Sequence, residues 1–386
     1  MRPLFPRVAL ALLGLSTTAC ALTNQLSPIS AAASPTPVPV QAQITRPAPT
    51  ATAIPPTPTE PASAIAARRV LVDFACQPEN RLDYPQDWCL LEPGSRGGID
   101  VFPPIPEAQF VDYAPTTNQL LYATHWPDHG AGPGGLSAID LWGFDVETTD
   151  VWPVVPDELV IDARWGPDGQ SIAYIIATPT TYQLRWRAAS GDDRLLAEDV
   201  PHTLSVSPDG EWVAFTRETS YEVGGTPGVY AVSLLNGEEI LLSDVDRGGW
   251  GSITDEIVWS WDSDHILLPV QDQLLRAAAD GSSSTTLTID ERLAREPWYL
   301  GQFQKVLWLP DGQRVVVTVN FGGPGLGPVG TATVVLELDA ALETVVAAAT
   351  VADDGGLLGW DLPGQSVWIN PYETPGPPVS LPLPKQ

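Results

Sequence analysis

The amino-acid sequence predicts an all-β fold, a six-bladed β-propeller closed by an N-terminal strand. A strand–turn–strand pattern built around Pro-Asp-Gly occurs six times from Tyr113 onward, at intervals of 41 to 53 residues. The composition favours strands and turns over helices, with 40 Pro, 33 Gly and 14 Trp against one Met. A period of about 40 to 50 residues with roughly four strands is typical of a propeller.

Residues 1–19 have the three parts of a signal peptide. Arg2 and Arg7 precede the apolar run 8–15, and small residues lead up to a cysteine, Cys20. The segment resembles a bacterial lipoprotein signal, which implies that Cys20 is lipidated and anchors the protein to the membrane outside the cytoplasm. Thr17 stands where that motif usually has leucine, so ordinary secretion is the alternative.

Residues 20–67 are predicted to form a disordered linker. From about Thr23 the composition is dominated by Pro, Thr, Ala and Ser, and the charged residues are Arg46 and Glu60. Such a segment cannot bury enough apolar surface to offset the entropy lost on ordering, so it favours an extended, partly polyproline II tether. The propeller is then expected to occupy residues 68–386.

Cys76 and Cys89 are the two cysteines that remain if Cys20 carries the lipid. In an exported protein an isolated pair this close in sequence favours a disulfide, which the loop-entropy model values at about 3 kcal/mol. A metal site or a reactive thiol pair is the alternative, but no histidine lies nearby.

The stretch 163–175 shows most clearly how the repeat folds. Trp165 ends one apolar strand, Pro167 presets the first turn position, Asp168 can accept hydrogen bonds from the turn backbone, and Gly169 tolerates a positive φ. A second apolar strand follows from Ile172. The stretch therefore predicts a hairpin that joins the first two strands of a blade.

The six repeats align on the aromatic or apolar residue before this turn. Pro-Asp-Gly is intact in the second, third and fifth repeats and altered in the other three. The aligned residues are Tyr113, Trp165, Val206, Trp259, Trp308 and Trp360. The last repeat is short, so we predict that an N-terminal segment, 70–74 or 99–101, supplies its missing strand and removes an exposed edge.

These repeats resemble those of TolB-type propellers. The shared pattern is Trp-x-Pro-Asp-Gly followed by x-x-[Ile/Val]-Ala-[Phe/Tyr], and it covers roughly residues 105–384. Propeller domains of prolyl-oligopeptidase-like enzymes use the same repeat. The resemblance implies the fold and, less specifically, a role as an interaction module of the cell envelope.

Net charge excludes one class of partner. The chain carries 47 acidic and 19 basic residues, a formal charge of −28. This charge repels phosphate backbones and anionic headgroups, so we expect no nucleic-acid partner and no membrane contact beyond the anchor.

Carboxylates recur in the turns of the intact repeats, at Asp168, Asp209 and Asp311. A ring of acids for metal binding or catalysis is one interpretation. Because each carboxylate would cap its own turn backbone, we favour a structural role.

The loops at the opposite end of each blade, the top face, are the predicted binding surface. They lie after each second strand and before each first strand, and they bring aromatic and charged residues toward a concave mouth. The candidate binding residues are His125, Asp128, His129, Arg217, Tyr221, Arg247, Trp250, Arg295 and Trp298. The cluster of two histidines and Asp128 does not have the spacing of a metal site, so neither a metal nor another cofactor is expected.

The sequence therefore predicts a monomeric, non-catalytic propeller that binds an envelope protein, a peptide or a glycan. No Gly-x-Ser-x-Gly motif occurs, and we assign no catalytic residue. The alternative is an enzyme of hydrolase or lyase type, or a small-ligand binder, that uses the central mouth of the ring.

Overall fold

The fold is known from a computed structural model in which every regular element among the described residues is a β-strand. No helix in the described part of the chain is long and apolar enough to span a membrane. The signal peptide and linker predicted over residues 1–67 lie outside that part. The structure describes residues 70–72, 88–91, 98–101, 108–125, 139–156, 158–201, 203–217, 226–245, 256–270, 273–287, 299–322, 328–339, 341–342, 344–352, 355–361, 366–370 and 379–384.

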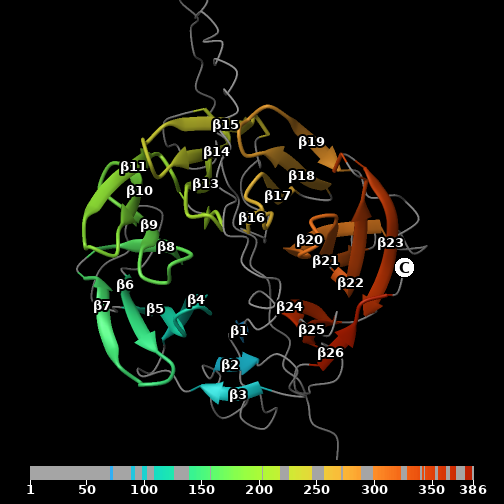
Figure 1. Ribbon diagram of the computed structural model, residues 1–386, viewed down its shortest axis with the longest axis horizontal. Coiled ribbons are helices and arrows are strands. Elements are labelled where there is room, and N and C mark those ends of the chain that lie inside the picture. The colour runs from blue at the N-terminus through green and yellow to red at the C-terminus, as the bar shows by residue number, and fades with distance from the viewer. Residues whose placement is uncertain are drawn as a thin grey trace, which may run out of the picture. The chain divides into compact units, whose positions relative to one another are not determined.

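Each of the six predicted repeats forms one antiparallel sheet, which we call blades 1 to 6 in chain order (Figure 1). Blades 1 to 5 have four strands and blade 6 has three. Blade 1 contains β4 (Gln109–Ala114), β5 (Gln119–His125), β6 (Ile139–Asp145) and β7 (Val151–Val155), and blade 2 contains β8 (Val160–Trp165), β9 (Ile172–Ala177), β10 (Tyr182–Arg187) and β11 (Asp193–Glu198). Blade 3 contains β12 (Leu204–Val206), β13 (Trp212–Arg217), β14 (Gly228–Ser233) and β15 (Glu239–Ser243), and blade 4 contains β16 (Val258–Trp259), β17 (His265–Val270), β18 (Gln273–Ala278) and β19 (Ser284–Leu287). Blade 5 contains β20 (Tyr299–Trp308), β21 (Arg314–Gly322), β22 (Pro328–Leu338) and β23 (Val345–Ala352), and blade 6 contains β24 (Gly356–Asp361), β25 (Ser366–Asn370) and β26 (Val379–Pro382).

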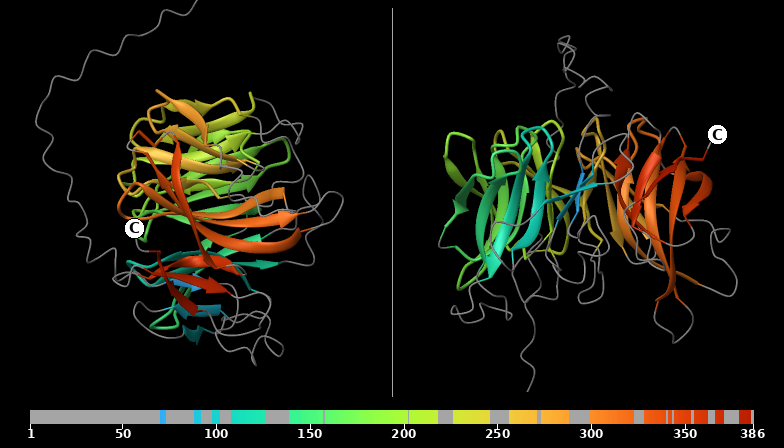
Figure 2. Two further views of the ribbon diagram at one scale, coloured as in Figure 1. Left: turned by 90° about the vertical axis from the view of Figure 1, so that its right-hand side faces the viewer. Right: turned by 90° about the horizontal axis from the view of Figure 1, so that it is seen from below.

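The first strands of the blades form the inner wall of a ring. The strands β4, β8, β12, β16, β20 and β24 contact one another in succession, and Figure 1 shows them nearest the centre of the ring. Seen from the side in Figure 2, the strands of each blade run between the two ends of the ring. The propeller predicted from six repeats is therefore confirmed.

The N-terminal segment closes this ring, but not as one strand added to blade 6. The strands β1 (Val70–Val72), β2 (Trp88–Leu91) and β3 (Gly98–Val101) pair with one another in a sheet of their own. The first of them contacts both β24 and β4, so the sheet lies between the last blade and the first. The prediction that residues 70–74 or 99–101 pair with blade 6 was wrong, because residues 70–72 and 98–101 pair with β2 instead.

The strand β2 explains why this small sheet closes the ring. Its four residues are all buried, and their side chains alternate between two neighbours. Trp88 packs with Tyr122 of blade 1, with ring centroids 6.1 Å apart. Cys89 and Leu91 pack with Trp368 of blade 6. A strand covered on both faces does not show the polar–apolar alternation of a half-buried strand, so sequence reasoning missed it.

Cys89 is disulfide-bonded, whereas Cys76, its predicted partner, lies outside the described residues.

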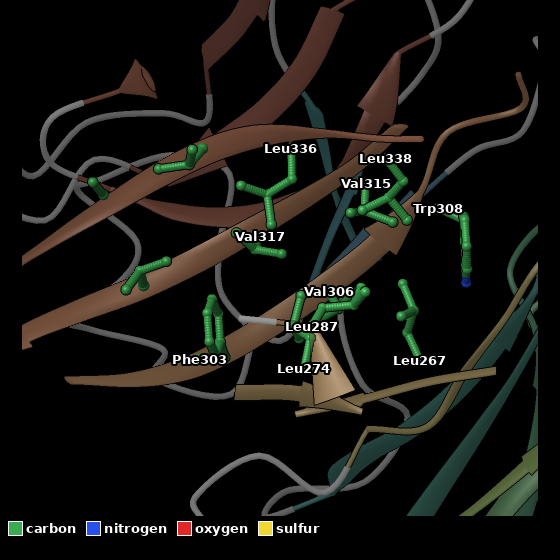
Figure 3. Close-up of a cluster of buried hydrophobic side chains, with 13 residues drawn as sticks. Leu267, Leu274, Leu287, Phe303, Val306, Trp308, Val315, Val317, Leu336 and Leu338 are labelled. Atoms are coloured by element: carbon green, nitrogen blue, oxygen red, sulfur yellow. The ribbon is translucent and has the colours of Figure 1, made fainter. Parts of the chain in front are cut away.

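Branched and aromatic side chains fill the spaces between neighbouring blades. Figure 3 shows the cluster between blades 4 and 5, where Leu267 and Leu274 meet Phe303, Val306 and Val317. Alternate residues of each strand contribute to the interfaces on its two sides, which suits the pleat of a sheet. The blades are therefore held mainly by face-to-face apolar packing.

Candidate functional site

Among the predicted top-face residues, the structure describes the side chain of Arg217. His125 is the last residue of β5, and its backbone alone is described. The other predicted binding residues lie outside the described part of the chain, and they are Asp128, His129, Tyr221, Arg247, Trp250, Arg295 and Trp298.

Arg217 joins blade 3 to blade 2. Its guanidinium forms a bidentate ion pair with Glu239, with N–O distances of 2.5 and 2.9 Å, and donates to the Glu198 carbonyl of β11 at 3.1 Å. It also lies over the rings of Phe215 and Tyr230, at 5.1 and 4.5 Å from their centroids. These contacts give the side chain a structural role, and its contact with a partner stays a prediction.

The repeated turn carboxylates bind their own backbone, as expected for a structural role. Asp168 Oδ1 accepts hydrogen bonds from the N–H groups of Gln170 and Ser171, both at 2.9 Å. Asp209 and Asp311 accept equivalent bonds two residues along the chain. Partial burial opposes ionisation of Asp168, but the hydrogen bonds outweigh it and lower its pKa.

A cavity of ≈ 300 Å³ lies against the inner strands of blades 1 to 5. It combines carboxylates, one guanidinium and several tryptophan rings in the centre of the ring. Pro208 and Trp261 belong to first-hairpin turns, so the cavity reaches the end of the ring that carries those turns. Its lining residues are Asp112, Arg164, Leu204, Ser205, Val206, Pro208, Glu256, Ile257, Val258, Trp259, Trp261, Leu307 and Trp308.

Arg164 is the cation of this cavity, and three carboxylates surround it. Its Nη1 lies 2.5 Å from Asp162 Oδ1, and its side chain is 31% exposed against 16% for Asp162. Burial acts to lower the pKa of Arg164, but the negative charges of Asp162, Asp112 and Glu256 together raise it. The group carries more negative than positive charge when all its members are ionised.

Asp112 has a raised pKa. Burial raises its pKa to about 6, although the charge of Arg164 and hydrogen bonds from backbone N–H groups act in the opposite direction. Its Oδ2 accepts from the Trp165 N–H at 2.7 Å. A carboxylate with this pKa is partly protonated at neutral pH, which is a common property of functional carboxylates.

Side-chain hydrogen bonds connect each inner strand with the next. Asp112 of β4 accepts a hydrogen bond from the Trp165 N–H of β8. Asp162 of β8 accepts one from the Leu204 N–H of β12 at 3.3 Å. Trp259 Nε1 donates to the Ser205 carbonyl of β12 at 3.2 Å. On the other side of the ring, Trp261 donates to the Trp308 carbonyl and Lys305 donates to the Leu358 carbonyl, both at 3.1 Å. Asp112 and Asp162 thus hold neighbouring blades together, and Asp112 also adds negative charge to the cavity wall.

Sequence reasoning missed Asp112, Arg164 and Glu256 because it searched the loops for functional residues. For Asp112 and Arg164, the available signal was their place in the inner strands, whereas Glu256 lies just before β16. Asp112 and Arg164 each come directly before an aligned repeat residue, inside segments that are otherwise largely apolar or aromatic. Charged residues in a buried strand need partners, so this position could have marked them.

No group of three or more His, Cys, Asp or Glu side chains among the described residues is arranged to hold a metal ion.

No protein-family model and no curated protein matches the chain. Solved structures that resemble it include an oligogalacturonate lyase from Vibrio parahaemolyticus, with 12% identity, a TM-score of 0.53, and coverage of 85% of this chain and 93% of that one. TolB from Acinetobacter baumannii has 14% identity and a TM-score of 0.43, over 69% of this chain and 64% of TolB, so the match spans less than two thirds of TolB. A periplasmic gluconolactonase from Pseudomonas aeruginosa has 14% identity and a TM-score of 0.47, over 82% of this chain and 98% of that one.

These structures differ in what their names say they do. At such low identity, the likeness to the lyase shows the fold alone. The fold and the repeats together identify the chain as a β-propeller built from six repeats.

Proposed function

We propose that the protein is a non-catalytic binding propeller that recognises a protein, peptide or glycan partner outside the cytoplasm. The observation that carries this proposal is the central cavity of ≈ 300 Å³, in which Asp112 and Glu256 lie together with tryptophan rings. Tryptophan faces beside a few polar groups are typical of binding sites. The predicted top-face residues remain candidates for further contacts with the partner.

The size of the cavity limits what can enter it. A volume of this order lies at the lower end of small-molecule pockets, so it suits one side chain or one sugar residue. A macromolecular partner would therefore insert a single group into the ring and place the rest of its surface against the rim.

The hydrogen bonds of the carboxylates favour binding over catalysis. Asp162 accepts from two backbone N–H groups and from Arg164, so its oxygens are engaged within the fold. Asp112 is tied to the backbone of β8. The raised pKa of Asp112 supports the alternative, an enzyme that uses this residue as an acid or base.

Export and anchoring are part of the same proposal. The signal-like residues 1–19 and Cys20 would attach the protein to the envelope membrane through the extended linker. A Cys20→Ser variant that still sediments with membranes would contradict the lipid anchor.

The binding proposal is tested with the full-length protein on peptide and glycan arrays. We expect ligands whose binding is lost in Glu256→Lys, which reverses a charge in the cavity, and kept in Glu238→Lys, which reverses an exposed charge in an outer turn. Binding that Glu256→Lys leaves unchanged would place the site elsewhere.

The same ligands should be recovered intact after incubation with the protein. Conversion of a bound peptide or glycan, lost in Asp112→Asn, would overturn the non-catalytic proposal and establish the enzyme alternative.

A further inference from the structure

The charges in the central cavity do not balance. Arg164 forms its ion pair with Asp162. Asp112 and Glu256 line the cavity together with Arg164, whereas Asp162 lies beside it, and neither Asp112 nor Glu256 has an ion pair with another described cation. The cavity wall thus has one guanidinium, which is paired with Asp162 outside the wall, and two carboxylates. Because the surroundings are partly buried, this excess is less screened than charge on the outer surface.

The excess charge selects among ligands. An anionic group, such as a phosphate or a uronic acid, would meet two carboxylates without a free cation. A neutral sugar could donate hydroxyl hydrogen bonds, but it would leave the charge excess in place. A cation would offset it, and the faces of Trp259 and Trp261 in the same cavity can favour a cation further.

A second feature of the cavity points to a ligand that also carries an acceptor. Trp308 lines the cavity and is 1% exposed, and its indole N–H has no hydrogen-bond partner in the structure. In Figure 3 the indole nitrogen lies at the end of the side chain away from Leu338. A buried N–H without an acceptor costs stability, and an acceptor oxygen that reached it would relieve this cost.

Resting on the proposed function, we infer that the partner is a peptide or protein that inserts a Lys or Arg side chain into the central cavity. Its cationic group lies between Asp112 and Glu256, its aliphatic stem contacts tryptophan, and its main chain provides the acceptor. The ligand class is therefore a basic peptide segment.

Three capped tripeptides test this inference by calorimetry with the full-length protein at physiological salt. They are acetyl-Gly-Lys-Gly-amide, its norleucine counterpart, which keeps the stem but lacks the amine, and its glutamate counterpart. We expect the lysine peptide to bind about tenfold or more tightly than the norleucine peptide, and the glutamate peptide not to bind.

Paired variants separate the cavity from the general acidity of the chain. Asp112→Asn with Glu256→Gln should abolish the preference for lysine. Glu147→Gln with Glu238→Gln removes the same charge from two exposed outer turns and should preserve it. Glu256→Gln alone is a second test, because Glu256 makes no hydrogen bond within the described structure and its loss leaves the fold intact.

Equal binding of the lysine and norleucine peptides, no binding of any peptide, or equal losses in both paired variants would each overturn the inference. Cavity-dependent binding of a neutral or acidic ligand on the arrays would overturn it while leaving the proposed function standing. Absence of any cavity-dependent ligand would overturn both.

Discussion

Two sets of carboxylates are held in opposite ways. One set lies in the first-hairpin turns, at the turn end of the ring, and the other lies on the inner strands that surround the central channel. Asp168 binds the backbone of its own turn, two and three residues along the chain. Asp112 and Asp162 bind backbone groups of the next blade, 53 and 42 residues away. The first kind of bond stabilises a local turn, whereas the second kind connects blades and leaves charge facing a cavity.

The pKa values follow this difference. Hydrogen bonds lower the pKa of Asp168 in its exposed turn, whereas burial raises that of Asp112 in the channel to about 6. The same residue type thus acts as a structural cap in one region and as a titratable group in the other. An aspartate that recurs at the same turn position of several repeats, as Asp168 does, indicates a structural role. A charged residue that occurs once in an inner strand, as Asp112 does, is a candidate for a functional role.

The largest expected effect is from removing Asp162. Asp162→Ala would leave the guanidinium of Arg164 without its closest partner and two backbone N–H groups without an acceptor. We expect a loss of about 3 kcal/mol in the free energy of unfolding, measured by urea denaturation. Asp192→Ala, in an exposed outer turn, is the control and should change stability by less than about 0.5 kcal/mol. A loss below about 1 kcal/mol for Asp162→Ala would show that the channel ion pair does not hold the blades.

The next effect is a pH dependence caused by Asp112. Its folded-state pKa of about 6 lies above the ordinary 3.8, so the folded protein binds an extra proton between these values. Stability should therefore rise as pH falls through about 6, with the gain complete below about 4. At 1.36 kcal/mol per pKa unit this amounts to about 2 to 3 kcal/mol, modulated by the neighbouring Asp162, Arg164 and Glu256.

The contribution of Asp112 is isolated by comparing denaturation midpoints with those of Asp112→Asn, which keeps an acceptor for the Trp165 N–H. The difference in stability between the two proteins should change between pH 7 and 5 and be constant above pH 8. Parallel curves for the two proteins would contradict a raised pKa.

The smallest effect is expected at the turn end. Asp168→Ala removes the acceptor for the Gln170 and Ser171 N–H groups, and we expect a loss of about 1 kcal/mol because the turn is exposed and water replaces the carboxylate. Asp168→Asn keeps one acceptor oxygen and should cost less. If Asp168→Ala costs as much as Asp162→Ala, the distinction between local and bridging carboxylates fails.

The blades could be predicted from the sequence because their determinants are local. In the second repeat, Pro167, Asp168 and Gly169 specify the turn within a few residues, and Gly169 has the expected positive φ of 63°. The channel could not be predicted in the same way. The hydrogen bonds around the channel join residues about one repeat apart, such as Asp112 and Trp165. They depend on the angle between neighbouring blades, which no local sequence pattern specifies.

The closing sheet was partly predictable for a related reason. Residues 70–72 and 99–101 were recognised as strands, but β2 was not, because its four buried residues take their partners from both ends of the repeat array.

The position of β2 also sets an order for assembly. Trp88 and its neighbours precede every repeat in the sequence, yet Leu91 packs against Trp368 of the last blade. During synthesis this strand can meet blade 1 early, but its other face has no cover until blade 6 has been made. The junction between the N-terminal sheet and blade 6 therefore cannot form before the last repeat emerges.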